Sequence, residues 1–220
     1  MEPVKKDFCK LLNYQRPCCV LYNTVESNKI IEKSKEPVPE LESDKFFKLI
    51  AVGSLKTIKG YNRLLHIIFR LKQENKKIRL YVLGIGPQEK ELKEYVEKKG
   101  LKENIIFLGY QTNPYKYVAK SELFVCSSFA EGFSTAATEA LIVGTPVCTV
   151  NVSGMKEMLG EDNEYGIVTE NSEEALYEGI KNIVDDPKKL KHYKRMAQIR
   201  GKIFNTQITT EKVEKLFSEL

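Results

Sequence analysis

The sequence predicts an α/β fold built on a doubly wound parallel sheet of about six strands. Two kinds of observation lead to this prediction. From about Phe46 onward, short apolar runs rich in Val, Ile and Phe alternate with amphipathic stretches, which is typical of βαβ units. Glycine stands in most of the turns that follow the apolar runs. The apolar runs place the strands at residues 48–53, 78–83, 104–109, 122–126, 146–150 and 165–168.

The helices are predicted from residues with helical spacing. Between the first two strands, Leu64, Ile68 and Leu71 fall at i, i+4 and i+7 and form one apolar stripe. A second helix spans about residues 88–99 and ends at Gly100, a natural C-cap. After the last strand, three further helices are expected at residues 173–185, 188–202 and 210–220, with Asp186-Pro187 between the first two.

The chain divides into three parts by composition. Residues 1–45 end in a polar, proline-bearing stretch, which predicts a connector. Residues 46–205 hold the alternating strands and helices and form the main domain, and residues 206–220 form a C-terminal helix. With 220 residues and 42% hydrophobic side chains, the chain can bury a proper core without disulfides.

Composition excludes several classes of function. The formal charge of +5 is spread over mixed Lys/Glu segments, so no nucleic-acid-binding stripe is expected. The five cysteines are odd in number and form no CxxC pair, which indicates a reducing, cytoplasmic compartment. His66 and His192 lack Cys or carboxylate neighbours at ligand spacing, so no metal site is expected.

Membrane contact is expected to be peripheral at most. No apolar run approaches the roughly 20 residues that a spanning helix needs, and the amino end has no apolar signal core. The basic run 188–195 has two interpretations. It is either an ordinary exposed helix or a surface that touches the acidic inner face of a membrane.

A doubly wound sheet binds its ligand beyond the carboxyl ends of its strands. The turn Gly84-Ile-Gly-Pro87 leaves such an end and precedes a helix, so a ligand can approach its backbone. Glu89 breaks the GxGxxG pattern of dinucleotide sites, and a tight structural turn explains the glycines equally well. Lys59-Gly60 stands at the start of a helix, where free N–H groups and the helix dipole favour an anion. Lys59 either completes a phosphate site there or is an ordinary surface lysine.

The stretch Glu131-Gly-Phe-Ser-Thr-Ala-Ala-Thr-Glu139 is the most informative. Gly132 leaves room for a close backbone approach, and Ser134 or Thr135 can cap the helix that follows, so that its first amides point at the ligand. Glu139 lies a little over one turn into that helix and, because helical side chains tilt toward the N-terminus, it leans back toward the same ligand. A carboxylate can accept both cis hydroxyls of a ribose together. The helix dipole alone also favours a carboxylate near the N-terminus, so a structural role stays open.

Taken together, these turns resemble the carboxy-terminal domain of the group 1 retaining glycosyltransferases, which have the two-domain GT-B architecture. The resemblance covers about Cys18 to Leu220 and implies a Rossmann-like fold for this chain, the C-terminal half of a GT-B fold. The matching segments are 20–23, 52–60, 83–87, 107–109, the Glu131/Glu139 pair with Ala140-Leu141, and 144–147.

The resemblance also implies a donor site for a UDP- or GDP-linked sugar, with no cofactor and no metal. Glu131 and Lys59 are the implied catalytic residues, since Glu131 meets the donor sugar and Lys59 neutralises the diphosphate. Glu139 would bind the ribose, and residues 84–87 with Gln111 would line the base pocket. The complete implied donor site is Gly53, Ser54, Lys59, Gly84, Gly86, Pro87, Gln111, Glu131, Gly132, Phe133, Ser134, Thr135 and Glu139.

Ser54 departs from the family pattern. The family usually has arginine five residues before the glycine-linked lysine, so one of two cations expected at the diphosphate is absent here. The loss of one such donor costs ~3 kcal/mol of transition-state stabilisation unless another group replaces it. Ser54 can still donate a hydrogen bond, and Lys56 is an alternative source of charge.

Length is the second departure. The resemblance implies an amino-terminal domain that holds the acceptor, and residues 1–45 are too few to form it. The sequence is therefore expected to be a fragment, a truncated product or a partner for a separately encoded half. Such a chain would bind nucleotide far better than it transfers sugar.

Two functions of different classes remain. The first is the donor-binding part of a retaining hexosyltransferase that acts on a glycan or lipid-linked acceptor in surface polysaccharide synthesis, an assignment by family analogy. The second is a non-catalytic nucleotide-sugar-binding module. A sugar epimerase of the same architecture is less favoured, because it also needs a two-domain cleft. A flavodoxin-like signalling domain would need an aspartate where Gly53 and Gly109 end their strands.

Overall fold

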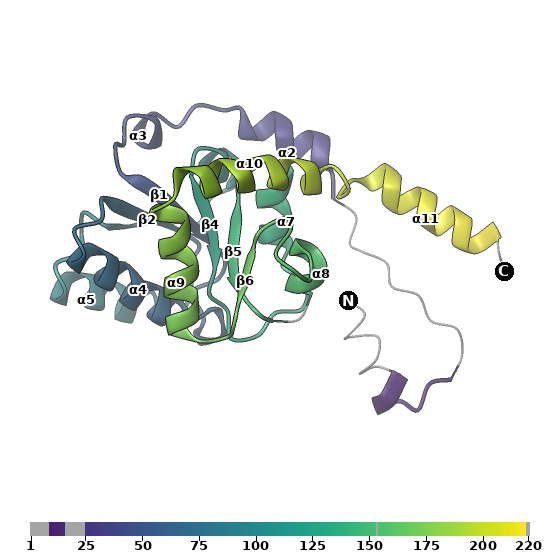
Figure 1. Ribbon diagram of the computed structural model, residues 1–220, viewed down its shortest axis with the longest axis horizontal. Coiled ribbons are helices and arrows are strands. Elements are labelled where there is room, and N and C mark those ends of the chain that lie inside the picture. The colour runs from purple at the N-terminus through teal and green to yellow at the C-terminus, as the bar shows by residue number, and fades with distance from the viewer. Residues whose placement is uncertain (1–8, 16–24, 153, 219–220) are drawn as a thin grey trace.

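The computed structural model describes residues 9–15, 25–152 and 154–218, and it confirms the doubly wound parallel sheet. The strand order is β3-β2-β1-β4-β5-β6, and every neighbouring pair is parallel. Figure 1 shows this sheet with helices packed around it. The predicted segment 20–23 lies outside the described residues. The strands are β1 (Phe47–Val52), β2 (Ile78–Leu83), β3 (Ile105–Gly109), β4 (Leu123–Cys126), β5 (Val147–Val150) and β6 (Ile167–Thr169).

The strands are mostly apolar because helices cover both faces of the sheet. Every residue of β4 and of β5 is buried, whereas the two edge strands β3 and β6 are largely half-buried. The chain winds outward in one direction through β2 and β3 and then returns to the other side of β1 with β4. The direction of winding therefore changes between β1 and β4, and this is the place where such sheets bind ligands.

The predicted helices are present, with small shifts of their ends. They are α4 (Tyr61–Gln73), α5 (Glu89–Lys98), α7 (Thr135–Ile142), α9 (Glu173–Val184), α10 (Pro187–Gly201) and α11 (Thr206–Ser218). Asp186 caps α10 by accepting hydrogen bonds from the N–H groups of Lys188 and Lys189, and Pro187 opens the helix, which explains the break after α9. Figure 1 shows α11 extending away from the sheet.

Several short elements were not predicted. A 3₁₀ turn, η1 (Thr57–Lys59), precedes α4, and four short helices are α2 (Ser27–Ser34), α3 (Pro39–Glu42), α6 (Tyr115–Ala119) and α8 (Met155–Leu159). The predicted connector contains α2 and α3, and it buries Ile30, Val38 and Leu41 in the core of the domain. Short segments of this kind have too few periods for an apolar pattern to reveal them.

Gly60 ends η1 in the left-handed conformation, with φ 65°. A Cβ at this position would lie 2.0 Å from the carbonyl oxygen of Ser127, which follows β4. Gly60 therefore allows the turns after β1 and β4 to touch, and these two turns form the site described below.

Replacing Gly60 with alanine is expected to destabilise the fold by about 3 kcal/mol, because left-handed strain and a backbone clash add together. The matched control is Gly100→Ala, where φ is 64° and a Cβ would have no neighbour within 4 Å. That variant should lose only about 1 kcal/mol. Urea unfolding of both variants measures the difference, and equal losses would contradict the packing explanation.

Candidate functional site

A pocket of about 380 Å³ opens at the carboxyl ends of β1 and β4, where the winding of the sheet changes direction. Its walls come from the turn after β1, the turn after β4 and the first turns of α7. The lining residues are Ala51, Val52, Gly53, Ser54, Lys59, Tyr61, Phe124, Val125, Cys126, Ser127, Ser128, Glu131, Phe133, Ser134, Thr135, Ala136 and Glu139.

Lys59 and Glu131 form an ion pair inside this pocket. The Lys59 Nζ atom lies 2.6 Å from Glu131 Oε1, and the Ser128 hydroxyl donates to the same oxygen at 2.6 Å. The side chains of Lys59 and Glu131 are 28% and 12% exposed, so water screens their attraction less than it would on an open surface. The two implied catalytic residues thus neutralise each other's charge.

The N-terminus of α7 faces the same pocket. Ser134 is the N-cap, and its hydroxyl oxygen accepts a hydrogen bond of 3.3 Å from the N–H of Ala137. The first N–H groups of a helix have no partner within it, and Thr135 and Ala136, which carry two of these groups, both line the pocket. Partial positive charge and free donors therefore stand beside Lys59, which suits an anionic ligand.

Glu139 extends the site away from Glu131. Its carboxylate accepts a hydrogen bond of 3.3 Å from the Tyr115 hydroxyl. Burial raises the pKa of Glu139 above its ordinary value, and the Tyr115 hydrogen bond offsets only part of this increase. Glu139 and Thr135 also line a second pocket of about 440 Å³ between α2 and α6. The two pockets therefore adjoin at Thr135 and Glu139.

Eight of the implied donor-site residues line the first pocket, and the other five do not. Gly84 packs against the turn after β1, where a Cβ would lie 1.9 Å from the Gly53 carbonyl oxygen, and a Cβ on Gly86 would lie 2.6 Å from the Leu55 carbonyl oxygen. At these glycines it is another turn of the protein that approaches the backbone closely. This agrees with the interpretation of residues 84–87 as a tight structural turn. Pro87 lines a separate surface pocket along α5.

Gln111 and Gly132 complete the five. The Gln111 side-chain amide donates to the Leu108 carbonyl at 2.7 Å and so braces its own turn. Gly132 is exposed, and a Cβ there would meet nothing within 4 Å. A base-binding role for residues 84–87 and Gln111 stays a prediction.

Five residues of the site neighbourhood were not predicted. Tyr61 donates its hydroxyl to the Gly53 carbonyl at 3.1 Å, and burial raises its pKa. Cys126 ends β4, Ser128 lies in the turn after it, and Tyr115 approaches from α6. Arg63 lies behind the turn after β4, and the only sequence signal for it is its position on the apolar face of α4, four residues before Ile67.

Ser54 lines the pocket at the place where the family usually has arginine. Lys56, the proposed substitute cation, is exposed and is not among the lining residues. Among the described residues, Lys59 is therefore the one lysine or arginine whose side chain lines this pocket.

The described parts of the chain contain neither a group of side chains suited to a metal ion nor a helix suited to span a membrane. No group of three or more His, Cys, Asp or Glu side chains is placed to hold a metal ion among residues 9–15, 25–152 and 154–218. Over the same ranges, no helix has the length and apolar character needed to cross a bilayer. Cys9, Cys126 and Cys148 are free thiols.

The fold and the site define a Rossmann-like domain with a polar pocket at its switch point. A family model described as "Glycosyl transferases group 1" matches residues 32–200. The chain belongs to this glycosyltransferase family, and the resemblance stated from its motifs is confirmed.

Two related proteins align with most of this chain. A Campylobacter jejuni protein, N-acetylgalactosamine-N,N'-diacetylbacillosaminyl-diphospho-undecaprenol 4-alpha-N-acetylgalactosaminyltransferase, is 35% identical over 192 residues, covering 86% of this chain and 50% of that protein. The putative colanic acid biosynthesis glycosyltransferase WcaL of Escherichia coli is 26% identical over 196 residues, covering 84% and 47%. The chain thus spans about half the length of these relatives.

Solved structures share the fold. Anabaena HepE in complex with UDP superposes with a TM-score of 0.78 at 21% identity, covering 92% of this chain and 57% of that one. The pneumococcal O-GlcNAc transferase GtfA, in complex with UDP and GlcNAc, gives 0.79 at 17% identity, covering 100% and 44%. These likenesses confirm the Rossmann-like domain of GT-B glycosyltransferases as the fold of this chain.

Proposed function

We propose that this chain is the donor-binding part of a retaining hexosyltransferase that transfers a hexose from a UDP- or GDP-linked sugar to a glycan or lipid-linked acceptor. The observation that carries the proposal is a single pocket that joins Lys59, Glu131, the N-terminus of α7 and Glu139. In this pocket Glu131 would face the sugar, Lys59 and the N-terminus of α7 the diphosphate, and Glu139 the ribose of a nucleotide sugar.

Each part of the donor has a chemically suitable partner. The diphosphate takes Lys59 and the free amides of α7, because both supply positive charge and N–H donors. The ribose hydroxyls donate to Glu139, and the hexose hydroxyls donate to Glu131. When the glycosidic bond breaks, negative charge grows on the leaving diphosphate, and these preorganised donors stabilise it. Transfer is expected to need no metal.

The names of the relatives support an acceptor that is lipid-linked or part of a surface polysaccharide. The Campylobacter protein is named for a diphospho-undecaprenol acceptor, and the E. coli protein for colanic acid biosynthesis. The alternative is a non-catalytic nucleotide-sugar-binding module. It is favoured by Ser54, since Lys59 meets the diphosphate without the second cation that the family usually supplies.

Calorimetric titration of the purified chain with UDP, GDP and ADP, and with their sugars, tests donor binding. One nucleoside diphosphate is expected to bind, with the same affinity in EDTA as in Mg²⁺. If none of the ligands binds, both the transferase and the module are wrong. Release of nucleoside diphosphate from the bound sugar donor, dependent on a lipid-linked acceptor and measured with a separately encoded acceptor domain supplied, separates the transferase from the module.

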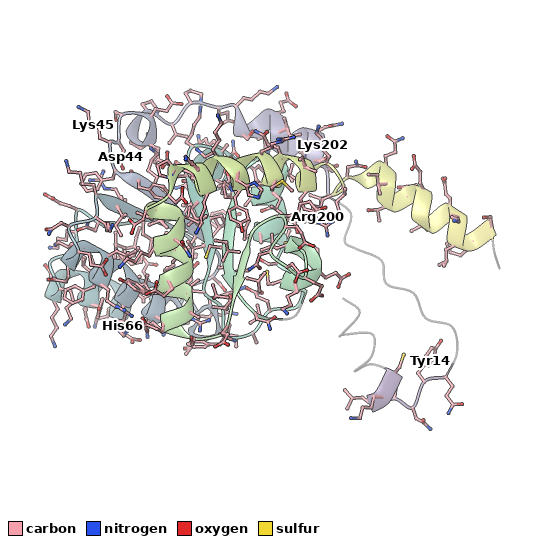
Figure 2. The ribbon with its side chains drawn as sticks, in the orientation of Figure 1. Tyr14, Asp44, Lys45, His66, Arg200 and Lys202 are labelled. Carbon is pink, nitrogen blue, oxygen red and sulfur yellow. The ribbon has the colours of Figure 1, made fainter. Side chains whose placement is uncertain are left out.

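We also propose that α10 touches an acidic membrane surface. Lys188, Lys191 and Arg195 are exposed at i, i+3 and i+7, and no ion pair engages them among the described residues. Figure 2 shows Lys202 at the end of the same helix. There Gly201 packs on Leu141, near the end of α7 remote from the pocket, so membrane contact would leave the pocket open.

Sedimentation with vesicles tests this contact. The chain should bind vesicles that contain phosphatidylglycerol and not neutral phosphatidylcholine vesicles. Replacing Lys188, Lys191 and Arg195 with glutamine removes about 1 kcal/mol for each charge and should abolish the binding. Equal sedimentation of the parent and the triple variant would contradict the role of α10.

A further inference from the structure

We propose that Arg63 is a positioning residue that, together with Asn171, holds the turn after β4 so that Glu131 stays at a set distance from Lys59. The proposal rests on the function proposed above and adds a residue that does not itself line the donor pocket. We call the pair Arg63 and Asn171 the clamp.

Arg63 is buried, at 5% exposed, and its guanidinium binds the turn through carbonyl groups. The Nε–H group donates to the Ser127 carbonyl at 2.7 Å, and an Nη2–H group donates to the Ser128 carbonyl at 2.8 Å. The guanidinium carbon lies 4.3 Å from the centre of the Phe129 ring. Three successive residues of the turn are therefore held by one side chain from α4.

Asn171 closes the clamp from the loop between β6 and α9. Its Oδ1 atom accepts a hydrogen bond of 2.8 Å from Arg63 Nη1, and its Nδ2 group donates to the Phe129 carbonyl at 3.2 Å. Arg63 and Asn171, which are 108 residues apart in the sequence, thus both hydrogen-bond to the same turn. Since both ends of the Asn171 amide are engaged, the position of Phe129 is tied to that of Arg63.

The clamped turn carries the groups that set the site. The Ser128 hydroxyl donates to Glu131 Oε1 at 2.6 Å, and the Ser127 hydroxyl donates to the Lys59 carbonyl at 3.0 Å. One turn thereby fixes the Glu131 side chain and the Lys59 backbone together. In a donor complex, this spacing would set where the hexose lies relative to the diphosphate, and small errors in such spacing are costly.

The chemistry of Arg63 is unusual for a purely structural residue. Burial lowers the pKa of its guanidinium, as expected where a charge is held away from water. Among the described residues its hydrogen bonds go to carbonyl and amide oxygens, with no carboxylate partner. An apolar side chain would fill the same space without holding a charge away from water. Only a planar fork of donors can hold two neighbouring carbonyls and an amide at once.

The test compares Arg63→Lys with Arg70→Lys. Arg70 is a matched control, because it lies on the same helix, stacks on Tyr177 at 3.7 Å and pairs with Glu174, away from the pocket. Affinity is measured for the nucleoside diphosphate that binds the parent best and for its sugar. In Arg63→Lys, affinity for the diphosphate should stay within about twofold while affinity for the sugar conjugate falls about tenfold. Arg70→Lys should change neither.

Two other results would overturn the role of the clamp. An equal loss for both ligands would show general damage to the pocket, and unchanged affinity for both would show no role. Hydrogen exchange of the amides of residues 127–133 gives a readout without ligand, and it should become faster in Arg63→Lys and stay unchanged in Arg70→Lys. If the parent binds no nucleotide, the proposed function fails, and unchanged exchange in Arg63→Lys would separately refute the clamp.

Discussion

Glu139→Gln is expected to weaken the binding of a nucleoside diphosphate about a hundredfold and, at neutral pH, to make the chain more stable. The loss of affinity follows because a neutral amide cannot accept both ribose hydroxyls as a carboxylate does, which is worth about 2.7 kcal/mol. The gain in stability follows because burial raises the pKa of Glu139, so the charged form destabilises the folded chain.

The two effects have a defined dependence on pH. The pKa of Glu139 is higher in the folded chain than in the unfolded chain, so folding favours the protonated form. Stability therefore decreases as pH rises from the unfolded pKa, about 4, through the raised folded pKa. Affinity for the nucleotide should change in the opposite direction, because the proposed contact with the ribose needs the carboxylate. It should fall as the pH drops through the raised pKa.

Calorimetry and thermal unfolding at several pH values measure both effects. Glu178→Gln is the control, since Glu178 is exposed on α9 and is not among the residues that line the pocket. That variant should change neither property. If Glu139→Gln binds nucleotide as tightly as the parent, the ribose role is wrong.

The second large effect is expected at the Lys59–Glu131 pair. Lys59→Gln should weaken the binding of a nucleoside diphosphate about 30-fold. Among the described residues, Lys59 is the one lysine or arginine in the pocket wall, so no second cation there can replace it. Glu131→Gln should strengthen the same binding about fivefold. The anionic diphosphate then no longer competes with Glu131 for the Lys59 ammonium group, which lies 2.6 Å from that carboxylate.

Opposite signs at two residues in contact make this prediction specific. Titrations at two salt concentrations measure it, and the Lys59→Gln/Glu131→Gln double variant gives the coupling between them. Lys56→Gln is the control, because Lys56 is exposed and is not among the lining residues. Weaker diphosphate binding in Glu131→Gln would contradict competition for Lys59. Sugar transfer by a Glu131→Gln enzyme at the parent rate would contradict the catalytic role of this residue.

The pocket also gives the Ser54 departure a structural meaning. Ser54 lies in the wall where its hydroxyl can donate a hydrogen bond, while Lys56 stands outside. The diphosphate would therefore depend on Lys59 and the α7 amides. This dependence explains why a single lysine substitution is expected to have so large an effect.

The sequence by itself determined the strands, the main helices and the residue types of the site. These features are local, since an apolar run, a helical stripe or the spacing from Glu131 to Glu139 is complete within a few turns of chain. The capped start of α7 and the position of Glu139 in its second turn follow from that spacing alone. The family resemblance rests on the same local segments and implies the functional roles of their residues.

Tertiary structure decided which of these segments meet. Lys59 reaches Glu131 across 72 residues because β4 pairs directly with β1 and so brings the turns after both strands together. The same pairing explains why Gly60 must lack a Cβ and why Arg63 is buried. The glycines at 84 and 86 pack on neighbouring protein turns for a similar reason. Strand order is a property of long-range packing, and no local pattern in the chain encodes it.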